Sequence, residues 1–345
     1  MSVAAGAPPA VHEVRARIRR RRALAFGGGI VALVLLSLVA LSVGEYPIGP
    51  LELVRTLSGG GDRLESYVVW QVRAPRLAMG LLVGGCLGVA GALLQALLRN
   101  PLASPDLLGI SGGSGAAAVF GLLILGVGGP ALALLAFAGG AVVAGFLLLA
   151  GRHRADGGYR LVLAGIGIAF LCSSVTGYLM VRAQVELAQN ALVWLTGSLA
   201  TTPWWQVGVV TLIAVLATPA VVVCARWLPL HQMGTATAVS LGVHPRTVRV
   251  LTVLTAVLLT AVTCAFVGPI SFIALCAPAI ARPLAGNGAV AIGTSGAVGA
   301  ALLVASDLVA QYALPGFSLP VGVVTGALGS VFLLWLLTTS KGRQL

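Results

Sequence analysis

Charged residues are scarce in this 345-residue sequence: Asp, Glu, Lys and Arg make up 9% of it, whereas 58% is hydrophobic. A soluble domain has about a quarter of its residues charged, so this composition excludes an ordinary soluble protein. A helix crosses the roughly 30 Å hydrocarbon core of a bilayer with about 20 apolar residues. We therefore expect an all-α, polytopic membrane protein with about ten transmembrane helices.

Acidic residues and histidines are scarcer still, with nine Asp and Glu together and four His. A secondary transporter would need coupling-ion ligands or an acidic relay near the midplane, and the scarce carboxylates argue against one. An intramembrane enzyme would need a nucleophile with a base, or a metal set, but the four histidines fall outside the expected spans. We expect no enzyme and no cofactor, and a secondary transporter remains the less favoured alternative.

Cysteine offers neither a metal site nor a disulfide framework. The five cysteines stand singly inside apolar runs, without CxxC spacing or a paired histidine, which favours core packing. They are Cys86, Cys172, Cys224, Cys264 and Cys276.

Ten apolar runs of spanning length can be placed along the chain. They cover residues 24–44, 75–98, 105–126, 129–151, 160–182, 204–226, 247–267, 270–285, 288–308 and 319–338. With a cytoplasmic N-terminus, 16 of the 21 basic residues fall on the cytoplasmic side and the other 5 outside, as the positive-inside rule requires. The net charge of +12 is therefore a topology signal rather than a nucleic-acid-binding surface. We expect a multi-pass protein of the bacterial plasma membrane, in contact with lipid, with both termini cytoplasmic.

The organisation expected is a basic cytoplasmic tail, residues 1–23, followed by one transmembrane domain, residues 24–345. Two connections are long. Residues 45–71 carry four carboxylates and three consecutive glycines, which indicates a wet extracytoplasmic loop with a flexible tip. Residues 229–246 are cut by prolines and glycines, and their middle piece, Thr235 to Leu241, predicts a short helix across the cytoplasmic face.

Glycine is abundant, with 46 residues, and small residues recur at helical spacing. Examples are Gly84, Gly88 and Ala92, and Gly322, Gly326 and Ser330. Such small-xxx-small faces let helix backbones approach closely, so ordinary helix packing is the simplest interpretation of each.

Six segments, in order along the chain, resemble the FecCD-type permeases, the membrane subunits of ABC importers for iron–siderophore complexes, haem and cobalamin. The run RNPLASPDLLGISGG at 99–113 is the most specific of them. The others are RAPR at 73–76, LVLAGIGIA at 161–169, MGTATAVSLGV at 233–243, GPISFIALCAPAIAR at 268–282 and LPVGVVTGALG at 319–329.

The resemblance implies a type II ABC importer permease fold with ten helices per subunit. It implies as partners a second permease subunit, two cytoplasmic ATPases and an extracytoplasmic binding protein. No GxxxxGK[ST] motif occurs in the sequence, so ATP would be hydrolysed by the separate ATPase subunits. A ferric siderophore is the expected substrate, with cobalamin or haem as the alternative.

The resemblance also assigns roles to residues. The segment around Gly234 to Gly242 would couple the permease to the ATPase, and Arg73 and Arg76 would dock the binding protein; snorkelling anchors are the alternative for the two arginines. The fifth and tenth spans would line the substrate route between two subunits, and the Gly157-Gly158-Tyr159 turn would be a cytoplasmic gate. The coupling residues are Gly234, Thr235, Ala236, Ala238, Leu241 and Gly242, and the route residues are Gly165, Ser173, Ser174, Gly177, Thr325 and Gly326.

Three departures from the family pattern stand out. Thr235 replaces a glutamate of the coupling segment, Ala279 replaces a histidine, and Gln311 replaces a second docking arginine. The loss at Gln311 leaves Arg73 as this subunit's docking charge and favours a heterodimer with a second permease, with a homodimer as the alternative. No charge pair is expected inside the membrane, and Asp307 is expected near an outer end.

Overall fold

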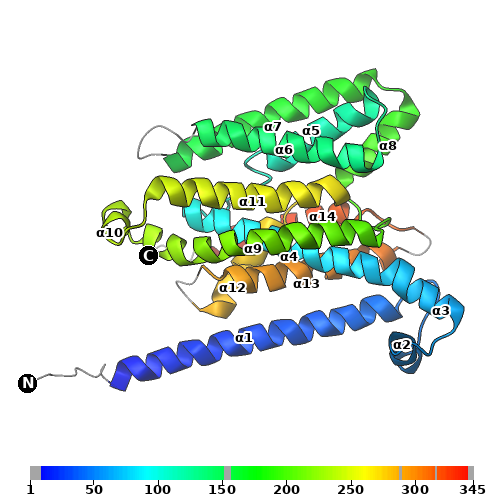
Figure 1. Ribbon diagram of the computed structural model, residues 1–345, viewed down its shortest axis with the longest axis horizontal. Helices are drawn as coiled ribbons and strands as arrows, with labels where there is room; N and C mark the ends of the chain where they lie inside the picture. The colour runs from blue at the N-terminus through cyan, green and yellow to red at the C-terminus, as the bar shows by residue number, and fades with distance from the viewer. Residues whose placement is uncertain (1–8, 151–156, 287–289, 315–316, 341–345) are drawn as a thin grey trace, which may run out of the picture.

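The computed structural model describes residues 9–150, 157–286, 290–314 and 317–340, and within these ranges the chain is almost entirely helical (Figure 1). The only β pairing among them is one isolated bridge between Leu314 and Phe317. The elements are α1 Pro9–Ser42, α2 Pro50–Leu57, α3 Arg63–Tyr67, the π-helix η1 Val68–Arg73, α4 Ala74–Leu98, α5 Ile110–Leu123, α6 Gly129–Ala150, α7 Gly157–Arg182, α8 Val185–Thr196, α9 Trp204–Gln232, α10 Thr235–Ser240, α11 Pro245–Val267, α12 Ile273–Ala285, α13 Ile292–Tyr312 and α14 Val321–Ser340.

Each of the ten expected spans contains one apolar helix. Six helices are long and apolar enough to cross a membrane, and four shorter apolar helices accompany them in the described chain. The two shortest, α5 with 14 residues and α12 with 13, rise only about 20 Å, less than the roughly 30 Å hydrocarbon core. The expected spans 105–126 and 270–285 are therefore partly non-helical chain, which is tolerated at membrane depth where protein surrounds it.

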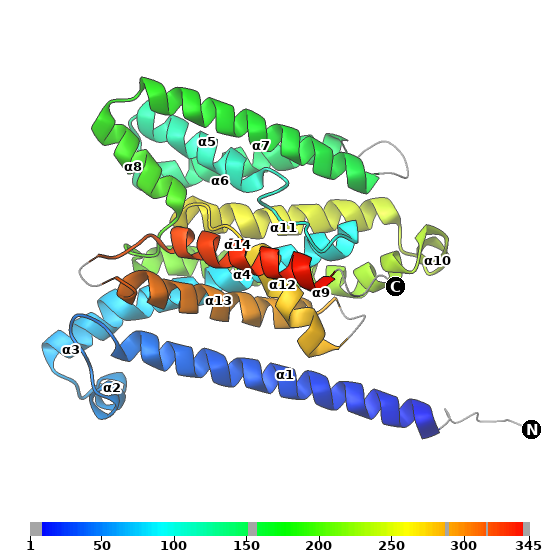
Figure 2. The same ribbon diagram turned by 180° about the vertical axis from the view of Figure 1, so that it is seen from behind.

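The ends of the bundle have distinct characters. The start of α1 and the end of α14 lie at the same end as α10, and α2 and α3 lie at the opposite end (Figures 1 and 2). We call these the α10 end and the α2 end. The expected boundary between residues 23 and 24 falls inside α1, which is one continuous helix from Pro9.

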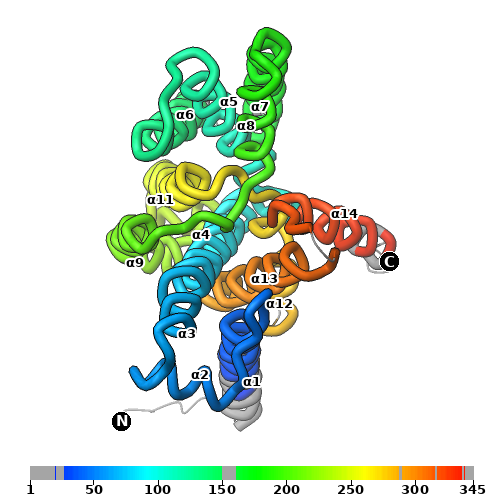
Figure 3. The backbone as a smooth tube through the Cα atoms, turned by 90° about the vertical axis from the view of Figure 1, so that its right-hand side faces the viewer, coloured from blue at the N-terminus to red at the C-terminus, as the bar shows by residue number. Residues whose placement is uncertain are grey.

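The helix α4 runs through the middle of the bundle, with α9, α11, α12 and α13 around it (Figure 3). Its glycines permit this packing, because a Cβ added at Gly84 would collide with the carbonyl of Gly299, and one at Gly88 with the carbonyl of Ser295. Both partners lie on α13, so two helix backbones touch with no side chain between them.

A proline sets the contact between α4 and α12. Pro278 lies inside α12 and has no N–H, so the carbonyl of Ala274, four residues earlier, has no helical donor. That carbonyl packs directly against Gly91 of α4, where any Cβ would overlap it. One turn further along α4, buried Gln95 donates from Nε2 to the carbonyl oxygen of Leu275 at 3.2 Å. The α4 backbone and one amide thus cover the irregular start of α12.

The connection after α7 contains a helix that the sequence analysis treated as loop. In α8, Ala191 packs with Val119 of α5 and Leu179 of α7 in one buried cluster. The end of α8 meets the α11–α12 connection and the start of α14: Gly322 donates its N–H to the Gly197 carbonyl at 3.2 Å, and Ser198 donates to the Val267 carbonyl at 2.8 Å. Gly197 and Gly268 both have positive φ, 72° and 74°, which suits glycine.

Residues 45–71 were expected to form an extracytoplasmic loop with a flexible tip, and the structure places a short helix on each side of that tip. These residues hold α2, α3 and most of η1, and the carboxylates of Glu52 and Glu65 accept hydrogen bonds from the backbone N–H groups of Gly49 and Asp62, the residues that precede the two α-helices. Two of the four carboxylates that indicated a wet loop are therefore helix-capping groups.

The α4–α13 contact yields a stability test. Gly84→Ala is expected to lower the free energy of unfolding by about 1–3 kcal/mol, because a methyl group there overlaps the α13 backbone. Gly145→Ala in α6 is the matched control, since a Cβ there meets nothing within 4 Å. Thermal unfolding of the purified protein in detergent would measure both, and equal midpoints would contradict the close-packing account.

Candidate functional site

The two arginines expected to dock a binding protein both lie at the α2 end, but each also has partners within the chain. Arg73 donates from Nη1 to the carbonyl oxygens of Leu41 at 2.7 Å and Ser42 at 3.2 Å, and from Nη2 to that of Tyr46. The carbonyls of Leu41 and Ser42 lie in the last turn of α1, where the helix dipole favours a cation. Arg73 therefore ties η1 to α1 through neutral groups, and no carboxylate pairs with it among the described residues.

Arg76 forms the ion pair that the sequence analysis did not foresee. Its Nε donates to Oδ2 of Asp307 at 2.9 Å and its Nη2 to Oδ1 at 2.8 Å. Gln311 donates to the same carboxylate at 2.8 Å. A bidentate Arg–carboxylate pair is geometrically specific and strong, so Arg76 and Asp307 join α4 to α13. The positive charge of Arg76 is neutralised inside the chain, whereas that of Arg73 is not.

Tyr312 extends this network to α1. Its hydroxyl donates to the Val43 carbonyl oxygen at 3.0 Å, while lying 3.2 Å from the side-chain oxygen of Gln311. Gln311, which stands where an arginine was expected, thus bridges Asp307 and Tyr312 within α13. The α2 end is consequently held by hydrogen bonds among α1, α4 and α13.

At the opposite end, α10 forms the short helix expected between Thr235 and Leu241. Gly234 precedes it with φ 113°, and Gly242 ends it with φ 77°. The N–H of Val243 donates to the Ala238 carbonyl oxygen at 2.9 Å, which closes the helix with a glycine in the left-handed position. The positive φ angles before and after α10 thus explain why glycine occupies both positions.

The side chains of α10 divide into two sets. Ala238 is buried against the chain itself, so it supports the helix rather than facing a partner. Thr235, Ala236, Leu241 and Gly242 are exposed. Large apolar side chains are also uncovered here, with Met233 exposed at 66% and Leu241 at 55%. The α10 surface is therefore uncharged, partly apolar and accessible.

The base beneath α10 is fixed by contacts between α4 and α9. Arg99 donates from Nη2 to the His231 carbonyl oxygen at 2.7 Å, and Gln232 donates from Nε2 to the Ala96 carbonyl oxygen at 3.0 Å. Because α10 follows Gln232 directly, a displacement of α10 would be transmitted to the end of the central helix α4.

Some of the residues expected to line a route are exposed in the structure, and others are buried. On α7, Ser173, Ser174 and Gly177 are exposed, and Ser174 Oγ donates to the Phe170 carbonyl oxygen at 2.9 Å. Gly165 is buried instead, since a Cβ there would overlap Leu108 of the α4–α5 connection. Gly165 is therefore a packing position on the inner side of α7.

On α14, Thr325 is buried and donates to the Gly322 carbonyl oxygen at 3.1 Å, whereas Gly326 faces open space. The expected gate residues Gly157, Gly158 and Tyr159 do not form a turn, because their backbone is the first turn of α7. The helices α7 and α14 lie on the same side of the bundle (Figure 3).

Much of that shared side is uncovered and apolar. Phe170 of α7 is exposed at 71%, Val185 of α8 at 72% and Val331 of α14 at 68%. We call the exposed side of α7, α8 and α14 the α7–α14 face. No charged residue lies on α14 from Val321 to Ser340. The face is therefore suited to an apolar or neutral neighbour.

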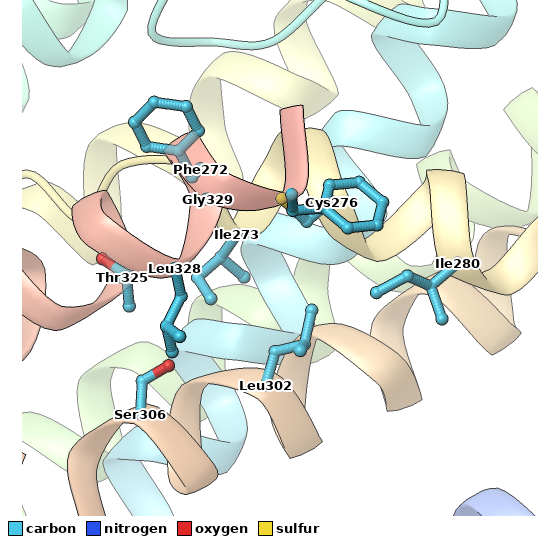
Figure 4. Close-up of a pocket in the computed structure, with 10 residues that line it drawn as sticks. Phe272, Ile273, Cys276, Ile280, Leu302, Ser306, Thr325, Leu328 and Gly329 are labelled. Carbon is cyan, nitrogen blue, oxygen red and sulfur yellow. The ribbon is translucent and has the colours of Figure 1, made fainter. Parts of the chain in front are cut away.

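A small cavity of about 80 Å³ lies behind α14, lined by α12, α13 and α14 (Figure 4). Phe272, Cys276, Leu302 and Gly329 are among its lining residues. Water takes up about 30 Å³ per molecule, so the cavity is too small to hold a metal chelate. Phe272, which has φ 69°, packs its ring directly over Gly329 and thereby connects the α12 start to α14.

Asp106 is a further polar residue that the sequence analysis missed. Its Oδ1 accepts a hydrogen bond of 2.5 Å from Ser111 Oγ in the first turn of α5. The backbone N–H of Phe272, immediately before α12, bonds it as well. The N-termini of two half-length helices thus share one carboxylate.

Comparisons with known proteins agree with this architecture. The FecCD transport family matches residues 32–339. The ferric enterobactin transport system permease protein FepG of Escherichia coli is 38% identical over 91% of this chain and 96% of its own length. The vitamin B12 import system permease protein BtuC of Klebsiella pneumoniae is 35% identical over 94% of this chain and 96% of its own length.

A solved structure described as an inward-facing metal-chelate type ABC transporter shares the fold. It superposes with a TM-score of 0.82 at 24% identity, covering 92% of this chain and 99% of the other. The family match extends over most of the sequence and includes every helix from α2 to α13. The chain is a multi-pass membrane permease, and it belongs to the FecCD transport family.

Proposed function

We propose that this chain is the membrane-spanning subunit of an ATP-driven importer that carries a ferric siderophore into the cell. The observation that carries the proposal is the match to the FecCD transport family together with a relative of 38% identity that is named for ferric enterobactin. A relative named for Fe(3+) dicitrate, FecD of Escherichia coli, is 37% identical, which extends the argument to ferric chelates in general. Cobalamin is the second candidate, because the vitamin B12 relative is 35% identical; haem is an alternative only by the family resemblance.

The substrate route, in this proposal, lies between two permease subunits along the α7–α14 face. Exposed Ser173, Ser174 and Gly177, together with half-buried Gly326, offer small, neutral surfaces on that side. Between Leu161 and Val181 α7 carries no charged residue, and neither does α14, while exposed Arg182 and Glu186 lie at the α7–α8 junction. A route with so few fixed charges suits a large chelate, whose metal is already coordinated, better than a bare ion that would need oxygen or nitrogen ligands. We further propose that Gly157, Gly158 and Tyr159, which form the first turn of α7, act as the cytoplasmic gate.

The proposed subunit arrangement has the α10 end in the cytoplasm, facing two separate ATPase subunits. Arg99 follows the last turn of α4, Arg226 lies near the end of α9, and Arg246 and Arg249 lie in the first turns of α11, so basic residues gather at that end, as the positive-inside rule requires of a cytoplasmic surface. The binding protein docks at the α2 end. Because Arg76 is neutralised by Asp307, Arg73 is the member of the Arg73–Arg76 pair that keeps its positive charge for docking, and a second, non-identical permease subunit supplies the other docking cation.

Uptake in cells tests the substrate. Deletion of the gene encoding this chain is expected to abolish uptake of radiolabelled iron supplied as a ferric siderophore, while uptake of labelled cobalamin is unchanged. Complementation with the intact gene is the control. Loss of cobalamin uptake with normal ferric siderophore uptake would contradict the substrate assignment.

Arg73→Gln tests docking. The change removes the charge and keeps hydrogen-bond donors for the α1 carbonyls, so the fold should persist while affinity for the binding protein falls about tenfold, or about 1.4 kcal/mol. Arg63→Gln, at an exposed site on α3, is the matched control and should bind as the unmodified chain does. Binding would be measured by surface plasmon resonance at two salt concentrations, and equal affinities for the two variants would show that Arg73 serves only to anchor α1.

Leu241→Asp tests the coupling surface. An Asp in place of an exposed apolar side chain on α10 should reduce ATPase copurification at least about tenfold, since an unpaired charge in an interface costs several kcal/mol. Leu314→Asp places the same change at the α2 end, where Leu314 is similarly exposed. Equal copurification of the ATPase with both variants would contradict the role of α10.

A further inference from the structure

The segment made of α2, α3 and η1, residues 50–73, carries large apolar side chains that no described part of the chain covers. We call it the outer segment. Leu51 is exposed at 83%, the highest value among them. The others are Val54, Leu57, Leu64, Tyr67, Trp70 and Val72, exposed at 62%, 40%, 56%, 61%, 42% and 50%. So many exposed apolar side chains between residues 51 and 72 indicate that a neighbour other than water covers this surface.

The buried side chains of the outer segment show at which level of the bundle this segment lies. Leu53 of α2 packs with Ile48 and Val69, and the cluster also touches Leu41. Leu41 belongs to the last turn of α1, where the apolar stretch Gly27–Ser42 ends. The helix α2 therefore lies at the level where the first apolar helix leaves the hydrocarbon core.

The orientation of α2 fits a position along a membrane surface. In Figures 1 and 2 α2 is seen end-on beside the end of α1, which runs across the page, so the two helix axes are roughly perpendicular. Figure 3 places α2 at the rim of the bundle next to α1, away from α7 and α14. A protein that docks over the middle of the bundle would not cover this rim.

The sides of α2 differ in polarity. Leu51 and Val54 are three residues apart and share one exposed side; Glu52 lies about 100° around the helix from Leu51, and Arg55, four residues after Leu51, lies at the border between the two sides. Within the outer segment acidic and basic residues alternate, as Glu52, Arg55, Asp62, Arg63 and Glu65, so no field of one sign is available to attract a charged partner. Apolar area rather than charge is what this surface offers.

Aromatic side chains surround the same level. Trp204, at the start of α9, donates from Nε1 to the Trp70 carbonyl oxygen at 2.7 Å, and Trp205 beside it is exposed at 47%. Tyr67 and Trp70 of the outer segment are exposed as well. Tryptophan and tyrosine gather where membrane helices pass from hydrocarbon to headgroups, because one part of each ring system is apolar and another is polar.

Large apolar side chains are exposed along α1 as well. Ile30, Val31, Val34, Leu35 and Leu38 of α1 are all exposed, as expected of a helix that faces lipid. A membrane surface would account for the aromatic side chains at this level, for the perpendicular orientation of α2 and for the exposed apolar side chains of α1.

We propose that the outer segment is a lipid-binding anchor: α2 lies in the headgroup region, with Leu51 and Val54 toward the acyl chains and Glu52 and Arg55 toward water. This is the outer leaflet in the orientation proposed above. An amphipathic helix of this kind buries its apolar side about 5–10 Å into the boundary between headgroups and acyl chains. Because Arg73 joins the end of the outer segment to α1, the anchor fixes the height of that guanidinium above the membrane. The inference depends on the membrane location and not on the substrate.

Nitroxide labels at single introduced cysteines test the proposal. Leu51→Cys, Val54→Cys, Glu52→Cys and Arg55→Cys would each be labelled in the full-length chain and reconstituted in phosphatidylcholine nanodiscs. The ratio of relaxation by oxygen, which concentrates in lipid, to relaxation by a water-soluble nickel chelate is expected to be several-fold higher at 51 and 54 than at 52 and 55. The unmodified chain, with its native cysteines, gives the labelling background.

Two results would overturn the anchor. Equally low ratios at all four positions would place α2 in water. Low ratios at 51 and 54 that are accompanied by immobilisation of these labels when the binding protein is added would assign the surface to that protein. Because the four sites lie on one short helix, a folding defect would affect all of them, whereas the proposal requires a difference between its sides.

Discussion

Close contact between helix backbones at the centre of the bundle is the constraint on which the rest of this structure depends. Lipid tails are as apolar as leucine, so helices in a membrane gain little from hiding apolar side chains and associate through close packing instead. Gly84 and Gly88 let α4 touch the backbone of α13, and Gly91 receives a carbonyl that Pro278 leaves without a donor. With α4 fixed in this way, the other helices arrange around it, and the two ends of the bundle become rigidly related.

The half-length helices α5 and α12 impose a second constraint, because the end of each one leaves backbone N–H and C=O groups without helical partners at a depth where water is scarce. The structure satisfies these groups with polar side chains and close glycine contacts. Asp106 serves the starts of α5 and α12, Gln95 covers the α12 backbone, and Gly197, Gly268 and Gly322 bring the ends of three elements together. Phe272 then connects this irregular region to α14 on the α7–α14 face. A change at α14 would therefore reach α12 and, through Asp106, α5.

The sequence predicts the architecture well and the roles of individual polar residues poorly. The lengths of the apolar runs predicted the positions of all ten apolar helices, and the positions of glycine and proline predicted α10. Both signals depend only on residues that are close together in the sequence. Asp307 and Arg76 are 231 residues apart, so nothing local indicates their pairing.

Gly165 was expected on a route, but it packs on Leu108, since the same small residue serves a route or a contact. The helix α8 was missed because a 12-residue apolar stretch is too short to register as a span, although Ala188, Ala191 and Leu195 recur at helical spacing. The three glycines at 59–61 drew attention to the tip, so the capping roles of Glu52 and Glu65 at the starts of α2 and α3 were not predicted.

The central claim is that this permease moves its substrate only as part of an ATP-driven assembly. Purified complex in proteoliposomes, with the binding protein outside and ATP inside, tests it most directly through the initial rate of ferric siderophore uptake. The account predicts uptake that requires ATP, the ATPase subunits and the binding protein together. Uptake by this chain alone, driven by a proton or sodium gradient without ATP, would contradict it.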